Sequence, residues 1–144
     1  MLLIGVLAIV AADQLAKFWL TGWASQGREW GPISLLLHHN YGISFGIELP
    51  SLLATGLIVG FLILLLGLFF ASHRQLPVYF LGLGLCIGGG ASNLWDRLSL
   101  GFVRDFVSVG ILPIFNLADI LILIGVVLMV IGALIHGPRQ DPSI

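Results

Sequence analysis

The chain has 144 residues, of which 58% are hydrophobic and 9% are charged. An ordinary soluble domain has about 25% charged residues, so this composition excludes a water-soluble globule and predicts a membrane protein. The net charge of −1 excludes the basic surface that nucleic acid binding needs, and a single cysteine excludes both an intramolecular disulfide and a multi-cysteine metal site.

Four apolar segments are long enough to cross a membrane: residues 1–20, 52–71, 76–94 and 117–135. Each has about 20 residues, the length that a helix needs to span a hydrocarbon core. The first segment contains Asp13 and Lys17, but no basic residue precedes its apolar run, which favours a membrane span over a cleaved signal peptide. We therefore predict a single integral membrane domain over residues 1–144.

The connections between these segments predict the topology. With an even number of spans, both chain ends lie on one side of the membrane, and the longer connections 21–51 and 97–116 lie on the other. These connections contain strand-like stretches at 33–37, 43–47 and 102–109, and a turn-like stretch at 39–42. The predicted fold class is an all-α membrane protein with four transmembrane helices and small strand and loop elements. Lysine and arginine counts are too similar on the two sides to assign the cytoplasmic one.

Polar side chains that a membrane tolerates poorly gather at the end of the predicted bundle that carries the longer connections. They are Asp13, Lys17, Asn40, Asn93, Asp96, Arg97, Asp105, Asn116 and Asp119. Some have a structural explanation: Asp13 and Lys17 are spaced as an i, i+4 ion pair, and Asn116 with Asp119 is typical of a capped helix start. Asp105 is harder to explain this way, because it interrupts an otherwise apolar stretch.

Two neighbouring carboxyl groups offer one specific chemistry. If Asp105 and Asp119 approach each other, both cannot ionise easily, so the pair shares one proton. The carboxylate then deprotonates water while the acid protonates a carbonyl, which is aspartic-protease chemistry without metal or cofactor. Asn93, Asp96 and Arg97 are spaced to lie on one helix face near this pair.

Other chemistries start from the same residues. The aspartates could bind Mg²⁺ for phosphoryl transfer on a lipid headgroup, with only Arg97 and Arg104 available for the phosphate. Acids could also relay protons in a small transporter, although clustering at one face argues against a path across the membrane. Residues 42–46 match the G-x-S-x-G motif of serine hydrolases, but the chain lacks the large α/β sheet that this motif needs. A serine could also pair with a lysine in a membrane protease, but Lys17, the only lysine, is already paired with Asp13.

Several separated motifs together resemble bacterial lipoprotein signal peptidase, the type II signal peptidase. They are DQLAK at 13–17, NYGISFG at 40–46, NLWDR at 93–97, Gly101, Val103 and Asp105-Phe106, and FNLAD at 115–119. The resemblance implies an aspartic endopeptidase of the bacterial cytoplasmic (inner) membrane, with both termini cytoplasmic and the site on the extracytoplasmic face. Its substrates are prolipoproteins that carry diacylglycerol on a cysteine, and it cuts immediately before that cysteine.

The same resemblance assigns roles by position. Asp105 and Asp119 are the catalytic pair; the substrate-binding or supporting residues are Asn40, Gly42, Asn93, Asp96, Arg97 and Asn116. Asp13 and Lys17 stay a structural pair, and no metal or cofactor is implied. The chain departs from the family pattern at Ser92, where glycine is usual and a small neighbour is expected to make room. The stretch 107–114 is also shorter than usual.

Overall fold

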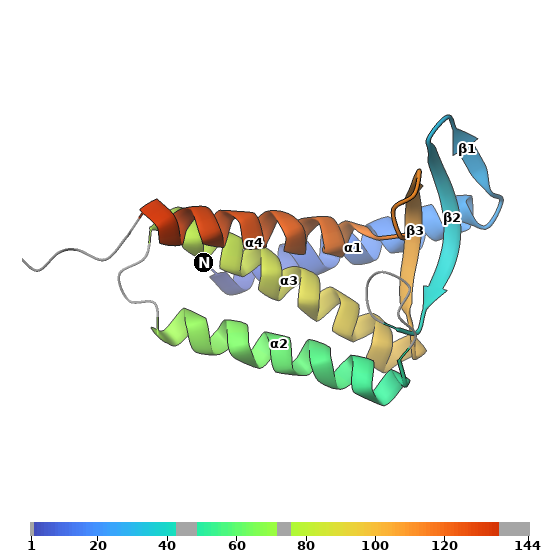
Figure 1. Cartoon of the computed structure of the whole chain (residues 1–144). Helices are drawn as coiled ribbons and strands as arrows, with labels where there is room; N and C mark the ends of the chain where they lie inside the picture. The colour runs from blue at the N-terminus through green and yellow to red at the C-terminus, as the bar shows by residue number, and fades with distance from the viewer. Residues whose placement is uncertain (1, 43–48, 72–75, 136–144) are drawn as a thin grey trace, which may run out of the picture.

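The computed structural model describes residues 2–42, 49–71 and 76–135. Its elements are α1 (Leu2–Ala24), β1 (Arg28–Trp30), β2 (Ile33–Asn40), α2 (Ser51–Ala71), α3 (Pro77–Leu100), β3 (Val103–Val109) and α4 (Leu117–Ile135). Four helices are long and apolar enough to cross a membrane. They run along one another, and a sheet of three strands lies across one end of the bundle (Figure 1). The predicted fold class is thus confirmed.

Two of the helices extend beyond the predicted apolar segments. In α1 the hydroxyl of Thr21 donates to the carbonyl oxygen of Lys17 at 2.6 Å, so a polar residue is accommodated without breaking the helix. The last residue of helix α3 is Leu100, and Gly101 caps the helix. The φ of Gly101 is 83°, in the left-handed region, and its N–H donates to the carbonyl oxygen of Arg97. Because the chain reverses at this cap, β3 begins beside the end of α3.

Helix α3 is the central element and packs against the other three helices. Glycines make its contact with α4 close: a Cβ atom on Gly125 would lie 2.6 Å from both the carbonyl oxygen of Gly82 and the Sγ atom of Cys86. Small residues at such positions allow helix backbones to touch in a membrane. The outer faces expose large apolar side chains such as Leu52 and Leu134. Tight α3–α4 packing therefore fixes the relative positions of polar residues on these two helices.

The sheet has the order β1-β2-β3 and is antiparallel. Strand β3 confirms the predicted strand-like stretch at 102–109, whereas the predicted stretch 43–47 lies outside the described residues. The predicted turn at 39–42 is wrong in its first half, because His39 and Asn40 pair with Arg104 and Val103. Pairing with β3 extends β2 and brings Asn40 to the centre of the polar end.

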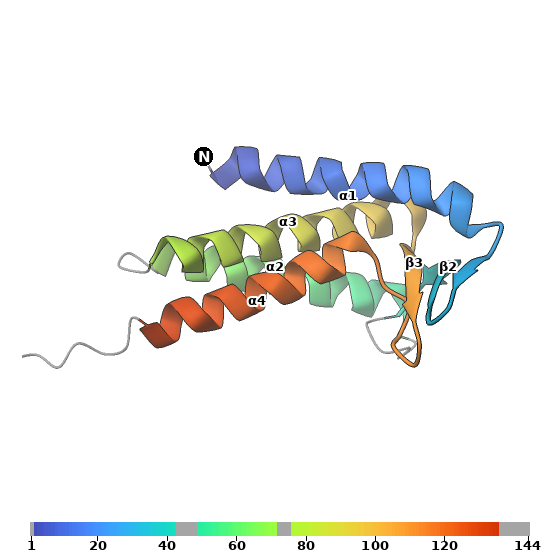
Figure 2. The same cartoon turned by 90° about the horizontal axis from the view of Figure 1, so that it is seen from above.

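The connection from β3 to α4 folds back along β3. The N–H groups of Phe106 and Val107 both donate to the carbonyl oxygen of Phe115, at 3.1 and 2.9 Å. The first three residues of the short stretch 107–114 therefore belong to β3. After this stretch the chain returns to β3, where Phe115 pairs with Val107. Figure 2 shows that the start of α1 and the end of α4 lie at the end of the bundle away from the sheet.

Candidate active site

Asp105 and Asp119 are brought together by one residue, Asn116. The side-chain amide of Asn116 donates to Oδ1 of Asp105 at 2.6 Å. Its backbone N–H donates to Oδ2 of Asp119 at 3.2 Å, and its side-chain oxygen accepts the N–H of Asp119 at 3.0 Å. This reciprocal capping pattern is the predicted helix start. The cap of α4 therefore places both carboxyl groups around the same asparagine.

The other oxygen of each carboxyl group also accepts a hydrogen bond. Asn40 donates to Oδ2 of Asp105 at 2.9 Å, and Asn93 donates to Oδ1 of Asp119 at 2.9 Å. Amide groups orient a carboxyl group without neutralising its charge. Neither acid takes part in any ion pair found within residues 2–42, 49–71 and 76–135. We call Asp105 and Asp119 the acid pair.

Asp105 is fully buried on β3. Burial and, after it, the charge of Asp119 raise the pKa of Asp105 from 3.8 to about 7, against the opposing effect of the hydrogen bonds from Asn40 and Asn116. Below about pH 7 the acid pair consequently retains a proton that an exposed aspartate would have lost. The arrangement supplies both a proton donor and a proton acceptor.

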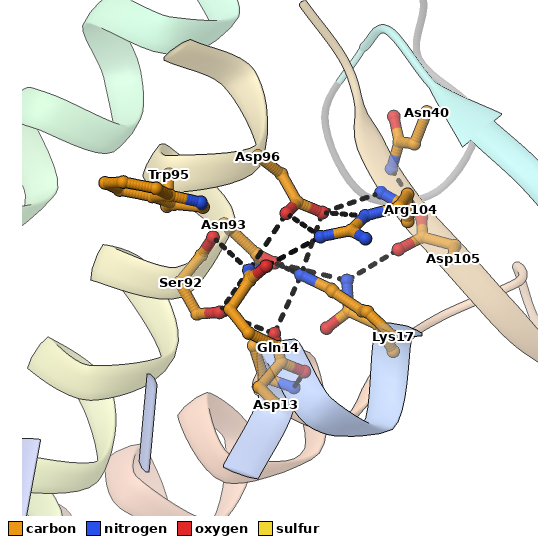
Figure 3. Close-up of polar contacts among 12 residues, drawn as sticks. Asp13, Gln14, Lys17, Asn40, Ser92, Asn93, Trp95, Asp96, Arg104 and Asp105 are labelled. Atoms are coloured by element: carbon orange, nitrogen blue, oxygen red, sulfur yellow. Dashed lines mark hydrogen bonds and ion pairs between the residues drawn. The ribbon is translucent and has the colours of Figure 1, made fainter. Parts of the chain in front are cut away.

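A second group of charged residues lies next to the acid pair and is balanced in charge. Lys17 lies 2.8 Å from Asp13 and 3.2 Å from Asp96, and all three side chains are fully buried. Arg104 lies 2.7 Å from Asp96. Figure 3 shows these side chains converging from α1, α3 and β3. We call Asp13, Lys17, Asp96 and Arg104 the ion cluster; the predicted Asp13–Lys17 contact is part of it.

Gln14, to which the sequence analysis gave no role, and Arg104, which it considered only as a phosphate-binding cation, complete this group. The amide of Gln14 donates to Oδ1 of Asp96 and to the hydroxyl of Ser92, both at 2.9 Å, and its oxygen accepts from Arg104 at 2.6 Å. Ser92 donates to Asp13 at 2.6 Å. The buried Ser92 side chain is therefore held by hydrogen bonds to Asp13 and Gln14. The sequence signal for Arg104 was its position in an apolar strand.

The residues predicted to share one face of α3 make three different sets of contacts. Asn93 contacts the acid pair and also accepts from Lys17 at 2.9 Å. Asp96 belongs to the ion cluster. Arg97 donates to the carbonyl oxygens of Tyr41, at 3.1 Å, and Gly42. In the described part of the chain, no three His, Cys, Asp or Glu side chains are arranged to hold a metal ion.

An apolar groove of about 490 Å³ reaches the acid pair. Its polar lining residues are Asn40 and Asp119. Its remaining lining is Leu112, Pro113, Ile114, Phe115, Ile120, Ile122, Leu123 and Val126. We call it the α4 groove. An apolar chain placed in it would therefore lie close to Asp119.

An acid pair that retains a proton, next to an apolar groove in a bundle of membrane-crossing helices, is typical of an aspartic peptidase that acts in a membrane. Comparison with known proteins agrees: the model of the family "Signal peptidase (SPase) II" matches residues 5–135. The chain belongs to this family of aspartic peptidases and cleaves the signal peptides of prolipoproteins.

Individual relatives cover nearly the whole chain. The lipoprotein signal peptidase of Caulobacter vibrioides is 39% identical over 91% of this chain and 84% of its own length. That of Moorella thermoacetica is 36% identical over 93% of each. A solved structure of a bacterial membrane enzyme superimposes with a TM-score of 0.82 at 25% identity, over 99% of this chain and 93% of that one. The predicted family, activity and multi-pass membrane character are confirmed.

Proposed function

We propose that Asp105 and Asp119 are the two catalytic residues of this signal peptidase. The observation that supports this most strongly is the position of Asn116, which is hydrogen-bonded to both acids at the start of α4. Both carboxyl groups are thereby held for joint action, and no cation among the described residues forms an ion pair with either. The raised pKa of Asp105 supplies the proton that the reaction needs at neutral pH.

The reaction follows from one shared proton. The ionised carboxylate accepts a proton from water as the water oxygen bonds to the carbonyl carbon of the scissile peptide, and the protonated carboxyl group donates its proton to the carbonyl oxygen. The tetrahedral diol then returns one hydroxyl proton to a carboxylate. The C–N bond breaks as the other carboxyl group protonates the leaving nitrogen. One water is consumed, and the acid pair again holds one proton.

The supporting residues act on this geometry. Asn40, Asn93 and Asn116 each hold an oxygen of the acid pair, so we assign them to orienting the two carboxyl groups. Arg97 binds the carbonyl oxygens of the two residues after Asn40, including Gly42, and so fixes the chain that leaves β2. We assign Asp13, Lys17 and Asp96 to holding the helices and β3 together rather than to the chemistry.

The proposed substrate is a prolipoprotein that carries diacylglycerol on the cysteine after the cleavage site. The apolar α4 groove includes Asn40 and Asp119 in its lining, which supports a substrate whose scissile bond is adjacent to long apolar groups. Such a substrate enters from the lipid, with its signal helix and acyl chains among or beside the helices. Cleavage then occurs immediately before the lipidated cysteine. Membrane lipids surround the enzyme and the substrate.

We further propose the bacterial cytoplasmic membrane as the location, with cytoplasmic termini and an extracytoplasmic active site. The start of α1 and the end of α4 lie at the end of the bundle away from the sheet, which supports a common side for both termini (Figure 2). A Ser25→Cys variant tests this, because Ser25 is exposed near the sheet and Cys86 is buried. A membrane-impermeant maleimide should label this variant on intact spheroplasts; labelling only after lysis would reverse the orientation.

Cleavage by the purified protein in detergent tests the catalytic assignment. Asp105→Asn and Asp119→Asn should each lower the rate on a diacylglyceryl-modified prolipoprotein by about 1,000-fold or more, because each removes one partner of the proton exchange. Glu29→Gln, an exposed acid on β1, is the matched control. Chelator should have no effect, the unmodified precursor should remain uncut, and mass spectrometry should place the cut before the cysteine. Survival of activity in either aspartate variant would refute the assignment.

A further inference from the structure

We propose that Arg104 is a positioning residue: held by Asp96 and Gln14, it fixes the backbone of β3 and thereby the place of the Asp105 carboxyl group. This inference rests on the proposed catalytic role of Asp105. Arg104 itself stays outside the acid pair, since its side chain bonds to residues of α1 and α3. Its effect on the reaction would pass through its neighbour in the chain.

Arg104 is attached through both its main chain and its side chain. Its backbone N–H donates to Oδ2 of Asp96 at 3.1 Å. Its guanidinium group donates to the same carboxylate at 3.3 Å through Nε and to Oδ1 at 2.7 Å, and also to the oxygen of Gln14 at 2.6 Å. A forked pair of charge-assisted bonds is directional as well as strong. The main chain at position 104 is thus tied to the end of α3.

The strand geometry carries this restraint to the next residue. Successive side chains of a strand point to opposite faces, so fixing Arg104 toward α1 and α3 directs Asp105 the other way. There Asp105 meets Asn40 and Asn116. In Figure 3, Arg104 lies next to Asp96 and Asp105 lies next to Asn40. A shift of the peptide between them would move the carboxyl group away from Asp119.

Arg104 also completes the charge balance beside the acid pair. The ion cluster holds Asp13 and Lys17 from α1, Asp96 from α3 and Arg104 from β3. Without Arg104 this cluster would carry one net negative charge.

The other charged or titratable groups that face the acid pair are Arg97 of α3 and His38 of β2, which lies opposite Asp105 in the strand register. Loss of Arg104 leaves these unchanged. An added negative charge makes further ionisation nearby less favourable, so the acid pair would release its protons at higher pH.

Arg104→Gln and Arg104→Lys, measured in the full-length enzyme, separate positioning from general stability. We expect Arg104→Gln to lower kcat about 10- to 100-fold per folded molecule with little change in KM, because misplacing a catalytic group mainly affects the chemical step. The acidic limb of its pH–rate profile should move to higher pH. Arg104→Lys keeps the charge but loses the fork, so it should keep the parental profile and recover only part of kcat. Arg28→Gln, an exposed arginine on β1, is the control.

A second background identifies the partner. In Asp96→Asn, where the guanidinium group has lost its carboxylate, Arg104→Gln should have a much smaller additional effect on kcat. Additive effects, or a loss of folded protein with kcat and pH profile unchanged, would overturn the positioning role. An active Asp105→Asn variant would instead refute the catalytic assignment, so the two failures are distinguishable.

Discussion

Two pairs of aspartates lie side by side at one end of this bundle, and their partners differ. Asp13 and Asp96 are bound by Lys17 and Arg104, so their charges are balanced. Asp105 and Asp119 are bound by neutral amide groups. Cations keep a buried carboxylate ionised, whereas amides orient it and leave its charge uncompensated. Buried acids of one residue type can therefore serve structure or chemistry according to what binds them.

Asn93 connects the two regions. Its oxygen accepts from Lys17 at 2.9 Å, and its amide donates to Asp119 at 2.9 Å. The positively charged side of the ion cluster is thus joined to the acid pair through a neutral group. This separation lets the ion cluster hold α1, α3 and β3 together without removing the proton from the acid pair.

Removing the buried cation should break the balanced region most severely. Lys17→Met leaves Asp13 and Asp96 with one cation between them, which should lower stability by about 3 to 5 kcal/mol. Thermal unfolding in detergent would measure this loss. The double variant Asp13→Asn/Lys17→Met should recover part of it, because Asp96 keeps Arg104. Arg28→Met, at an exposed site, serves as the control; a Lys17→Met protein that melts with the parent would contradict the distinction between the two regions.

The pH dependence of stability should distinguish the acid pair. The pKa of Asp105 is raised from 3.8 to about 7 in the folded protein, so Asp105 contributes stability that is fully present below pH 3.8 and is lost as pH rises through about 7. Asp105→Asn removes this contribution. Over that range the parent should therefore lose stability relative to the variant as pH rises, measured by parallel thermal melts. Melting curves that keep a constant separation would show that Asp105 titrates normally.

A smaller effect is expected from one orienting amide. Asn40→Ala removes the donor to Oδ2 of Asp105, while Asn116 still holds the other oxygen. We expect a loss of kcat of about tenfold, which corresponds to about 1.4 kcal/mol, with a nearly unchanged melting temperature. Ser34→Ala on the same strand is the control. A large fall in melting temperature with unaltered kcat would assign Asn40 to the sheet alone.

The parts of this molecule that the sequence predicts well depend on local patterns. Hydropathy identifies the four spans because each helix meets the membrane separately. The contact of Asp13 with Lys17 and the cap formed by Asn116 follow from spacings of a few residues. The topology of the spans then brings the acids to one end of the bundle.

The parts that were missed depend on contacts between distant segments. Gln14 meets Asp96 and Arg104 from 82 and 90 positions away, and no local pattern indicates such a contact. The end of β2 was wrongly predicted as a turn because its pairing with β3 decides the conformation of His39 and Asn40. Spacing along the chain does not show that Asp96 pairs with Lys17 and Arg104 and is no part of the acid pair, because these contacts join different helices and strands.

Infrared spectroscopy tests most directly whether the acid pair holds a proton while the ion cluster is ionised. In a detergent without ester groups, the protein near pH 6 should show the C=O stretch of a protonated carboxyl group, because the pKa of Asp105 is raised to about 7. The band should be lost in Asp105→Asn and should persist in Asp13→Asn. Asp119→Asn should only weaken it, because burial, the larger cause of the raised pKa of Asp105, remains. A parent protein without the band, or a band that survives in Asp105→Asn, would contradict the account.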